Sequence, residues 1–242
     1  MGGAGPHPLD NPALAALEAG PQARFAERRG RVLRYPVDMS PFAGVPSAPD
    51  SADWADAAAL VGPGGLLVLA GYAAPPPEHW EQVFRIPGVQ LTGEALRAEA
   101  DPEAVPLTAA DVPEMLDLVA RTRPGPFLPR TVEMGAYLGI RRDGALVAMA
   151  GERMRPPGWT EISAVCTDPA FRGQGLAARL VRAVAVGIRA RGDVPFLHAA
   201  LENADAIRLY EALGFRVRRK LCFLGTTVPG AAVPDATVSD RD

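Results

Sequence analysis

The sequence predicts an α/β protein, and two observations carry this prediction. Strand patterns alternate with amphipathic helix patterns over residues 104–225. A loop with two glycines, at residues 172–177, stands between one of these strands and an Arg-rich helix pattern. A chain of 242 residues with 48% apolar residues can bury a core around such elements.

The N-terminal part of the chain has weaker patterns. Residues 1–8 are rich in Gly and Pro, and we expect them to be frayed. Beyond them we expect one helical region, a second helix entered from Ser51 as its cap, a buried strand and a strand pair around a Pro87-Gly88 turn. These elements are expected at 12–30, 53–61, 65–72 and 80–91.

The C-terminal part has clearer signals. Thr108 is a helix cap, Asp143-Gly144 is a hairpin turn, and Gly192 ends the helix that follows the glycine loop. We expect a strand at 105–107, a helix at 108–121 and a hairpin of two strands at 137–142 and 145–154. After these we expect a strand at 159–166, the glycine loop and its helix at 172–191, a strand at 195–200, a helix at 204–213 and a final long strand or strand pair at 215–224.

Composition shifts divide the chain into three parts. We predict a smaller N-terminal α/β companion domain over 1–103, a main domain over 104–225 and a disordered tail over 226–242. The first part has seven Arg against 13 Asp and Glu, whereas the rest has 18 Arg and Lys against 15 Asp and Glu.

The overall charge of −3 predicts neither a nucleic-acid partner nor a membrane partner. Cys166 and Cys222 lie in apolar strand patterns, so we expect reduced thiols rather than a disulfide. We find no Cys and His cluster with metal-ligand spacing and expect no metal. The start of the chain shows no signal-peptide pattern, and the sequence predicts a cytoplasmic protein.

The loop at 172–177 predicts a phosphate site, because glycines leave backbone N–H groups uncovered at a helix N-terminus. A Walker loop is excluded, since the only lysine, Lys220, lies far from the loop. A Rossmann fingerprint is formally matched by Gly173, Gly175 and Ala178. Its context disagrees, because residues 167–172 separate the strand from the glycines and Asp193 precedes the next strand.

A third pattern fits the loop. Arg172-Gly173-Gln174-Gly175-Leu176-Ala177 has the form Arg/Gln-x-x-Gly-x-Gly/Ala. Leu201-Glu202-Asn203 and then Ile207-Arg208-Leu209-Tyr210-Glu211-Ala212-Leu213-Gly214-Phe215 follow it. Together these segments resemble the GNAT superfamily of acyl-CoA-dependent N-acetyltransferases, over about residues 105–225.

The resemblance implies a mixed, mostly antiparallel twisted sheet flanked by helices, with acetyl-CoA as the acyl donor. It implies that residues 172–177 wrap the pyrophosphate of coenzyme A, with Arg172 adding charge. The strand before the loop would splay from its neighbour, and its edge at Val165, Cys166 and Thr167 would bond the pantetheine amides. The cofactor-binding set is then Val165, Cys166, Thr167, Arg172, Gly173, Gln174, Gly175, Leu176, Ala177, Asn203 and Tyr210.

Tyr210 is the candidate acid. In the family, a tyrosine at this position can protonate the departing thiolate, and the asparagine, here Asn203, touches the cofactor. The seven residues from Asn203 to Tyr210 are nearly two helical turns, so both side chains can face one cleft. The alternative is that Tyr210 is a core aromatic between Ile207 and Leu213.

Glu161 is the candidate base, because an ammonium must lose a proton before its nitrogen attacks a thioester. The alternative is a surface glutamate paired with an arginine. Glu152 and Glu133 are weaker substitutes, and His198 fits a structural histidine better than a base. Cys166 as an acyl-carrying nucleophile lacks a visible His–acid relay to activate it.

The sequence therefore predicts acyl transfer, with acetyl as the expected group, to a primary amine of a small molecule or a peptide, in a monomer or homodimer. A different class stays open: a non-catalytic acyl-CoA-binding or regulatory module that keeps the loop. The N-terminal hundred residues are expected to shape the acceptor site, although a degenerate second GNAT-like half is conceivable. Their acidic charge points to a cationic amine.

Overall fold

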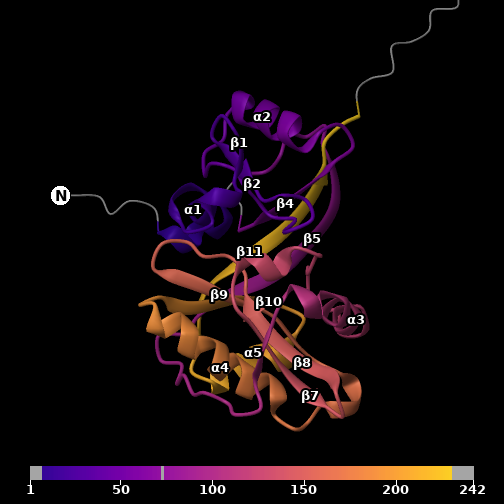
Figure 1. Cartoon of the computed structure of the whole chain (residues 1–242). Coiled ribbons are helices and arrows are strands. Elements are labelled where there is room, and N and C mark those ends of the chain that lie inside the picture. The colour runs from indigo at the N-terminus through magenta and orange to yellow at the C-terminus, as the bar shows by residue number, and fades with distance from the viewer. Residues whose placement is uncertain (1–6, 72–73, 231–242) are drawn as a thin grey trace, which may run out of the picture.

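The computed structural model describes residues 7–71 and 74–230 (Figure 1). Its main element is an eight-stranded sheet with the strand order β4-β11-β5-β10-β9-β8-β7-β6. All neighbouring strands in it are antiparallel except β9 and β10. A small three-stranded sheet, β1-β2-β3, lies near the N-terminus. The prediction of a mixed, mostly antiparallel sheet flanked by helices is confirmed.

The strands are β1 (Glu27–Arg29), β2 (Val32–Arg34), β3 (Ala43–Gly44), β4 (Leu66–Ala70), β5 (Glu81–Thr92), β6 (Val105–Leu107), β7 (Tyr137–Arg142), β8 (Ala145–Glu152), β9 (Trp159–Thr167), β10 (Val194–Ala200) and β11 (Arg216–Thr227). The α-helices are α1 (Pro12–Ala19), α2 (Ser51–Val61), α3 (Val112–Thr122), α4 (Leu176–Ala190) and α5 (Ala204–Ala212). Short 3-10 helices are η1 (Pro8–Asp10), η2 (Ala23–Phe25), η3 (Ala109–Asp111), η4 (Thr131–Met134) and η5 (Pro169–Phe171).

The large sheet crosses the boundary expected near residue 103. β4 and β5 come from the N-terminal part, and β5 lies between β11 and β10. Figure 1 shows β5 and β11 running side by side from the N-terminal part into the body of the sheet. The N-terminal segment therefore supplies a central strand of the sheet that carries the glycine loop.

The predicted strand pair at 80–91 is wrong, because β5 is one continuous strand. Pro87 and Gly88 pair with Cys222 and Leu221 of β11 instead of turning. A Cβ on Gly88 would lie 2.7 Å from the Phe223 ring and 2.9 Å from the Ala199 carbonyl oxygen. This glycine allows close packing within the sheet.

Three further expectations need correction. The helix expected over 12–30 ends at Ala19, because the backbone becomes extended at the C-cap residue Gly20. The N-cap of α2 is Asp50 rather than Ser51, and its carboxylate accepts the N–H of Asp53 at 3.0 Å. β11 continues to Thr227, two residues into the segment expected to be a tail.

Residues 1–6 and 231–242, which cover most of the expected frayed start and disordered tail, lie outside the described residues. At the start of the described chain, His7 caps η1, so residues 7 and 8 are already part of a hydrogen-bonded turn.

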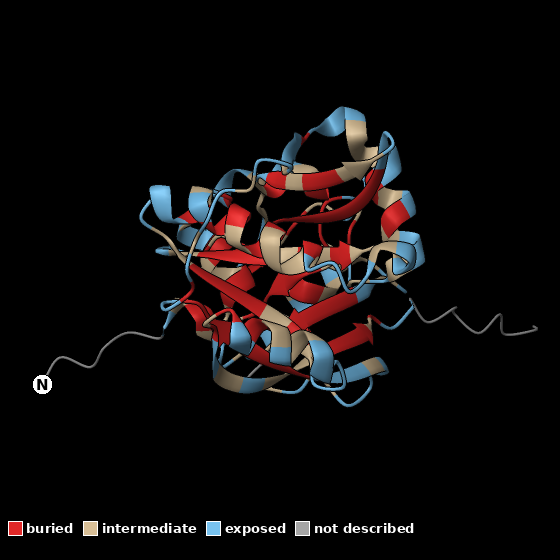
Figure 2. Ribbon diagram, turned by 90° about the horizontal axis from the view of Figure 1, so that it is seen from below, coloured by how far each residue is buried: buried red, intermediate tan, exposed pale blue. Residues whose placement is uncertain are grey.

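Helices cover both faces of the sheet between β7 and β10. The apolar side of α4 packs on Val147, Ile162 and Leu197, and α3 packs on Met149 and Cys166. Figure 2 shows the result: buried strands lie between helices whose outer surfaces are exposed. The two helix layers fix β9, and with it the glycine loop that follows it.

Candidate functional site

β9 separates from its neighbour β10 in the middle of the sheet. The two strands pair over three positions only, from Trp159 opposite Val194 to Glu161 opposite Phe196. On its other side, the register of β9 against β8 shifts between Met149 and Gly151. Ala164 lies in this bulge with φ of +52°, a left-handed conformation that is uncommon for a residue with a Cβ. The bulge lies just beyond the point where β9 and β10 stop pairing, and among the described residues no strand pairs with the β10-facing edge of residues 165–167.

The glycine loop joins the end of β9 to α4. Gly173 and Gly175 have φ of +78° and +71°, and a Cβ at either position would point into open space. Gly175 is the N-cap of α4, and no side chain caps this helix. Among the described residues, no group accepts a hydrogen bond from the N–H groups of residues 173–177. These donors form a cradle at a helix N-terminus, which is an anion site.

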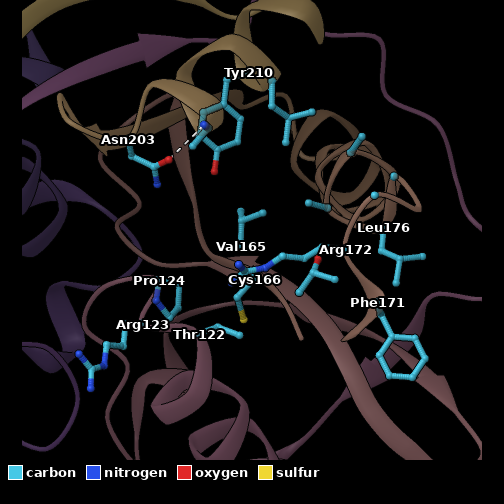
Figure 3. Close-up of a pocket in the computed structure, with 17 residues that line it drawn as sticks. Thr122, Arg123, Pro124, Val165, Cys166, Phe171, Arg172, Leu176, Asn203 and Tyr210 are labelled. Atoms are coloured by element: carbon cyan, nitrogen blue, oxygen red, sulfur yellow. Dashed lines mark hydrogen bonds between the residues drawn. The ribbon is translucent and has the colours of Figure 1, made fainter. Parts of the chain in front are cut away.

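A first cavity of about 360 Å³ lies between this cradle, β9 and α5 (Figure 3). Its lining includes every residue expected to bind the cofactor except Gln174, which is exposed outside it. The structure thus brings together Val165, Cys166, Thr167, Arg172, Gly173, Gly175, Leu176, Ala177, Asn203 and Tyr210. Thr122, Arg123, Pro124 and Phe171 also line it and were not predicted.

Three unpartnered groups in this cavity fit a coenzyme A molecule. They are the loop N–H groups, the exposed Arg172, which makes no ion pair within the described chain, and the buried Oγ1 of Thr167, which lacks a hydrogen-bond partner. The amides and Arg172 suit phosphate oxygens, whereas Thr167 lies on the strand edge that would face an amide-containing arm. Residues 165–177 can therefore hold the cofactor that the resemblance implies.

Tyr210 lies where the first cavity meets a second one. Its ring packs at 5.9 Å from the ring of Phe215, and the residue is 8% exposed. Figure 3 shows the hydroxyl directed into the cavity, toward β9. No hydrogen-bond partner for this hydroxyl exists among the described residues. Burial raises the pKa of Tyr210 to about 12, so the phenol carries its proton at neutral pH.

The second cavity has a volume of about 420 Å³. It shares Val165, Asn203 and Tyr210 with the first cavity, together with Arg123, Pro124 and Ala206. Its far wall comes from the N-terminal segment and from the end of β11. A molecule in each cavity would therefore meet its neighbour beside Tyr210.

Asn203 has a second role that the sequence pattern did not show. Its Oδ1 accepts the Ala206 N–H at 3.2 Å, so it caps α5. The amide nitrogen stays free for a ligand in the cavity (Figure 3). Both the cap and the cavity position thus depend on this one side chain.

Glu161 lines neither cavity and is fully buried. Its two carboxylate oxygens accept hydrogen bonds from Arg153 at 2.7 and 2.9 Å, and Oε1 also lies 2.7 Å from Nδ1 of His198. Burial alone would raise the pKa of Glu161, but the Arg153 charge and these hydrogen bonds lower it to about 2. Such a carboxylate is a weak proton acceptor without direct access to an incoming amine.

His198 lines the second cavity, but both of its ring nitrogens are engaged. Nδ1 faces Glu161, and Nε2 lies 3.0 Å from the amide nitrogen of Gln90. Arg218 donates to the Gln90 oxygen at 2.8 Å, which orients the amide so that its N–H points at His198. Both ring nitrogens of His198 are therefore held by neighbouring side chains, as expected of a structural histidine.

The other candidates lie outside the junction of the two cavities. Glu152 is buried and pairs with Arg191 at 2.7 Å, and Glu133 pairs with Arg130. The Cys166 thiol lines the first cavity, but burial raises its pKa to about 11, which disfavours the thiolate a nucleophile needs. Both cysteines are free.

Sequence reasoning missed the apolar wall of the second cavity and two of its charged residues, Arg153 and Arg123. Phe42, Phe84 and Phe223 come from three distant segments that only the topology of the sheet brings together. No pattern among residues that are adjacent in the sequence predicts this wall.

Comparisons with known proteins show which family the chain is similar to. The family model of FR47-like proteins matches residues 137–224. The N-alpha-acetyltransferase RimI of Mycobacterium tuberculosis (strain ATCC 25618 / H37Rv) is 37% identical over 83 residues, which are 33% of this chain. The match spans 51% of that relative, so the chain matches about half of its length.

Solved structures extend the likeness to 93% of the chain. A GNAT-family protein from Novosphingobium aromaticivorans DSM 12444 is 40% identical, with a TM-score of 0.83 over 93% of this chain and 100% of that one. A GCN5-related N-acetyltransferase from Kribbella flavida, at 20% identity, has a TM-score of 0.58 over 93% of this chain and 98% of its own. The chain belongs to the GNAT superfamily of acyl-CoA-dependent N-acetyltransferases.

None of the described helices is long and apolar enough to cross a membrane. No group of three or more His, Cys, Asp or Glu side chains that could hold a metal ion occurs within residues 7–71 and 74–230.

Proposed function

We propose that this protein transfers an acetyl group from acetyl-CoA to a primary amine, with Tyr210 as the acid that protonates the departing thiolate. The observation that carries the proposal is the position of Tyr210. Its hydroxyl has no partner among the described residues and lies at the junction of a cavity with an anion cradle and a second cavity.

The first cavity is the proposed donor site. The N–H groups of residues 173–177 and the Arg172 side chain hold the pyrophosphate, and the free edge of β9 at residues 165–167 pairs with the amides of the pantetheine arm. Bound acetyl-CoA supplies a thioester beside Tyr210. Holding it against an amine in the second cavity replaces a bimolecular encounter by a local one.

Tyr210 completes the proton balance. The amine nitrogen forms a bond to the thioester carbonyl carbon, and the bond from that carbon to sulfur breaks. Tyr210 donates its phenolic proton to the leaving sulfur, and the proton lost by the nitrogen restores the phenol through solvent in the cavity. The raised pKa of Tyr210 keeps the phenol protonated before each turnover, so the proton is available for the leaving sulfur.

Glu161 is not needed as a direct base in this scheme. Its carboxylate holds Arg153 and His198 in place at the wall of the acceptor cavity. Glu202, an exposed carboxylate in the lining of the second cavity, and solvent are the groups that can take the ammonium proton.

The name of the Mycobacterium tuberculosis relative indicates an α-amino group as its acceptor. This supports α-amines as the first acceptors to test for the present chain. A cytoplasmic location, and a monomeric or homodimeric state, stay predictions.

Release of free thiol from acetyl-CoA in the presence of a library of primary amines tests the proposal. We expect release that depends on the amine, and an N-acetylated product by mass spectrometry. The stability of the protein to heat is measured in parallel. A hundredfold excess of acetyl-CoA over its Kd should raise the free energy of unfolding by about 2.7 kcal/mol, whereas NAD or ATP should not raise it. Binding of acetyl-CoA without release by any amine would favour a non-catalytic module. Equal stabilisation by NAD would contradict the donor site.

A further inference from the structure

The N-terminal segment contributes only apolar side chains to the acceptor cavity. They are Phe42, Val68, Phe84 and Ile86, and Phe223 of β11 lies beside them. We propose that the acceptor is a primary amine with an aromatic or branched apolar group close to its nitrogen, and that Phe42, Phe84 and Phe223 bind this group. This inference rests on the proposed function, because it assigns the second cavity to the acceptor.

The aromatic side chains of this wall are held in place by the side chains packed around them. The Phe42 and Phe223 rings lie 6.3 Å apart, and the Phe223 ring lies 5.7 Å from the His198 ring in an edge-to-face arrangement. The Arg153 guanidinium lies 4.8 Å from the centroid of the Phe42 ring. Glu161 holds Arg153 and His198 in place, and these two side chains pack against the Phe42 and Phe223 rings. A preformed apolar surface of this kind favours an apolar ligand.

The charges around the cavity do not fit a highly cationic acceptor. None of the Asp and Glu side chains of the first 103 residues that the structure describes lines the cavity. The charged residues in the lining are Arg123, Arg153 and Glu202, and the Arg153 charge is neutralised by Glu161. The acidic side chains of the N-terminal segment therefore lie away from the cavity, and the aromatic wall offers a ligand apolar contact instead.

The apolar wall of the cavity also helps the chemistry. Removing an ammonium from water lowers its pKa, so the amine binds more readily in the neutral form that attacks the thioester. The proton is left in solvent outside the cavity. The wall of the cavity thus lowers the need for a strong base next to the reacting nitrogen, which agrees with the enclosed position of Glu161.

A matched pair of α-amines, L-phenylalaninamide and glycinamide, tests the inference, since they differ only in the benzyl group. We expect kcat/KM to be about tenfold to a hundredfold higher for L-phenylalaninamide, the range expected for burying one large apolar side chain. Phe84 is half-buried, so Phe84→Ala should fold, and it should lower this preference at least several-fold. Phe84→Leu should retain part of it. Val83, the neighbour of Phe84 on β5, is 51% exposed and lines neither cavity, so Val83→Ala should keep the full preference.

Calorimetric titration of L-phenylalaninamide into the protein saturated with coenzyme A gives a readout apart from turnover. Binding that Phe84→Ala weakens, without turnover, would support the cavity assignment and contradict acetyl transfer. Equal kcat/KM for the two amines would overturn the inference and leave acetyl transfer intact. A preference that Phe84→Ala does not change, or neither binding nor turnover of L-phenylalaninamide, would also overturn it.

Discussion

The carboxylate of Glu161 and the imidazole of His198 form one buried pair, with Oε1 lying 2.7 Å from Nδ1. The guanidinium of Arg153 closes the arrangement with two hydrogen bonds to the same carboxylate. The pair links β9 to β10 just where the two strands begin to separate. Glu161 thus stabilises the base of the cleft instead of facing the reacting groups.

This arrangement predicts a pH-dependent stability. The pKa of Glu161 is about 2 in the folded protein, below its ordinary value of 4.5. Because the folded-state pKa is depressed, its stabilisation is complete above pH 4.5 and is lost as the pH falls toward 2. Glu161→Gln should lower the free energy of unfolding at pH 7 by about 3–5 kcal/mol, the cost of breaking a buried ion pair. The deficit should shrink between pH 4.5 and 2.

Urea unfolding at pH 7, 4.5 and 2.5 measures this deficit. Glu133→Gln is the matched control, since Glu133 makes an exposed ion pair with Arg130 and should contribute less than about 1 kcal/mol. A deficit for Glu161→Gln that is the same at all three pH values would show that its charge is not the cause.

Gly175→Glu should abolish acetyl-CoA binding while the protein stays folded. The new side chain would point into open space in the cradle and bring bulk and negative charge to the place where the pyrophosphate approaches. The left-handed φ of +71° adds a strain of about 1 kcal/mol. Gly64→Glu is the control, because Gly64 has the same φ, open space at its Cβ and no place in either cavity. If calorimetry finds that Gly175→Glu binds acetyl-CoA with unchanged affinity, the pyrophosphate does not bind at residues 173–177.

The bulge at Ala164 should control the donor site. Ala164→Val puts a branched side chain into a left-handed conformation, which should cost about 1–3 kcal/mol of stability. The neighbouring edge at Val165 should shift with it, so we expect at least tenfold weaker acetyl-CoA binding. Ala164→Gly tolerates this conformation and should keep the affinity. If the two variants, both folded, bind acetyl-CoA equally, the bulge does not position the edge of β9.

Local signals in the sequence were sufficient to predict the lining of the first cavity, which is the proposed donor site. The glycines before an amphipathic helix and the spacing from Asn203 to Tyr210 are short-range patterns, and the structure places these residues around that cavity. The Asp143-Gly144 signal is also short-range, and it marks the turn between β7 and β8. The resemblance to a known superfamily added the chemistry of the ligand. Both kinds of information concern residues that are close together in the chain.

The acceptor half could not be predicted in this way. Phe42, Phe84 and Phe223 are far apart in the sequence, and they meet because β5 enters the sheet between β10 and β11. Pro87-Gly88 looks like a turn, because proline and glycine favour turns, yet cross-strand packing against Phe223 keeps the strand straight. For Glu161 the sequence left open a base or a surface glutamate paired with an arginine, and the structure pairs it with Arg153 in a buried position.

Turnover of Tyr210→Phe tests the proposed chemistry most directly. The ring and its packing against Phe215 remain, and only the hydroxyl is removed. Tyr137→Phe is the matched control, since the Tyr137 hydroxyl is buried without a partner and lines neither cavity. With an amine that the wild-type protein acetylates, we expect Tyr210→Phe to lower kcat by about 10²–10⁴ while the Kd for acetyl-CoA stays within a factor of about two. Tyr137→Phe should match the wild type in both. Full turnover by a correctly folded Tyr210→Phe variant would contradict the role of Tyr210 as proton donor.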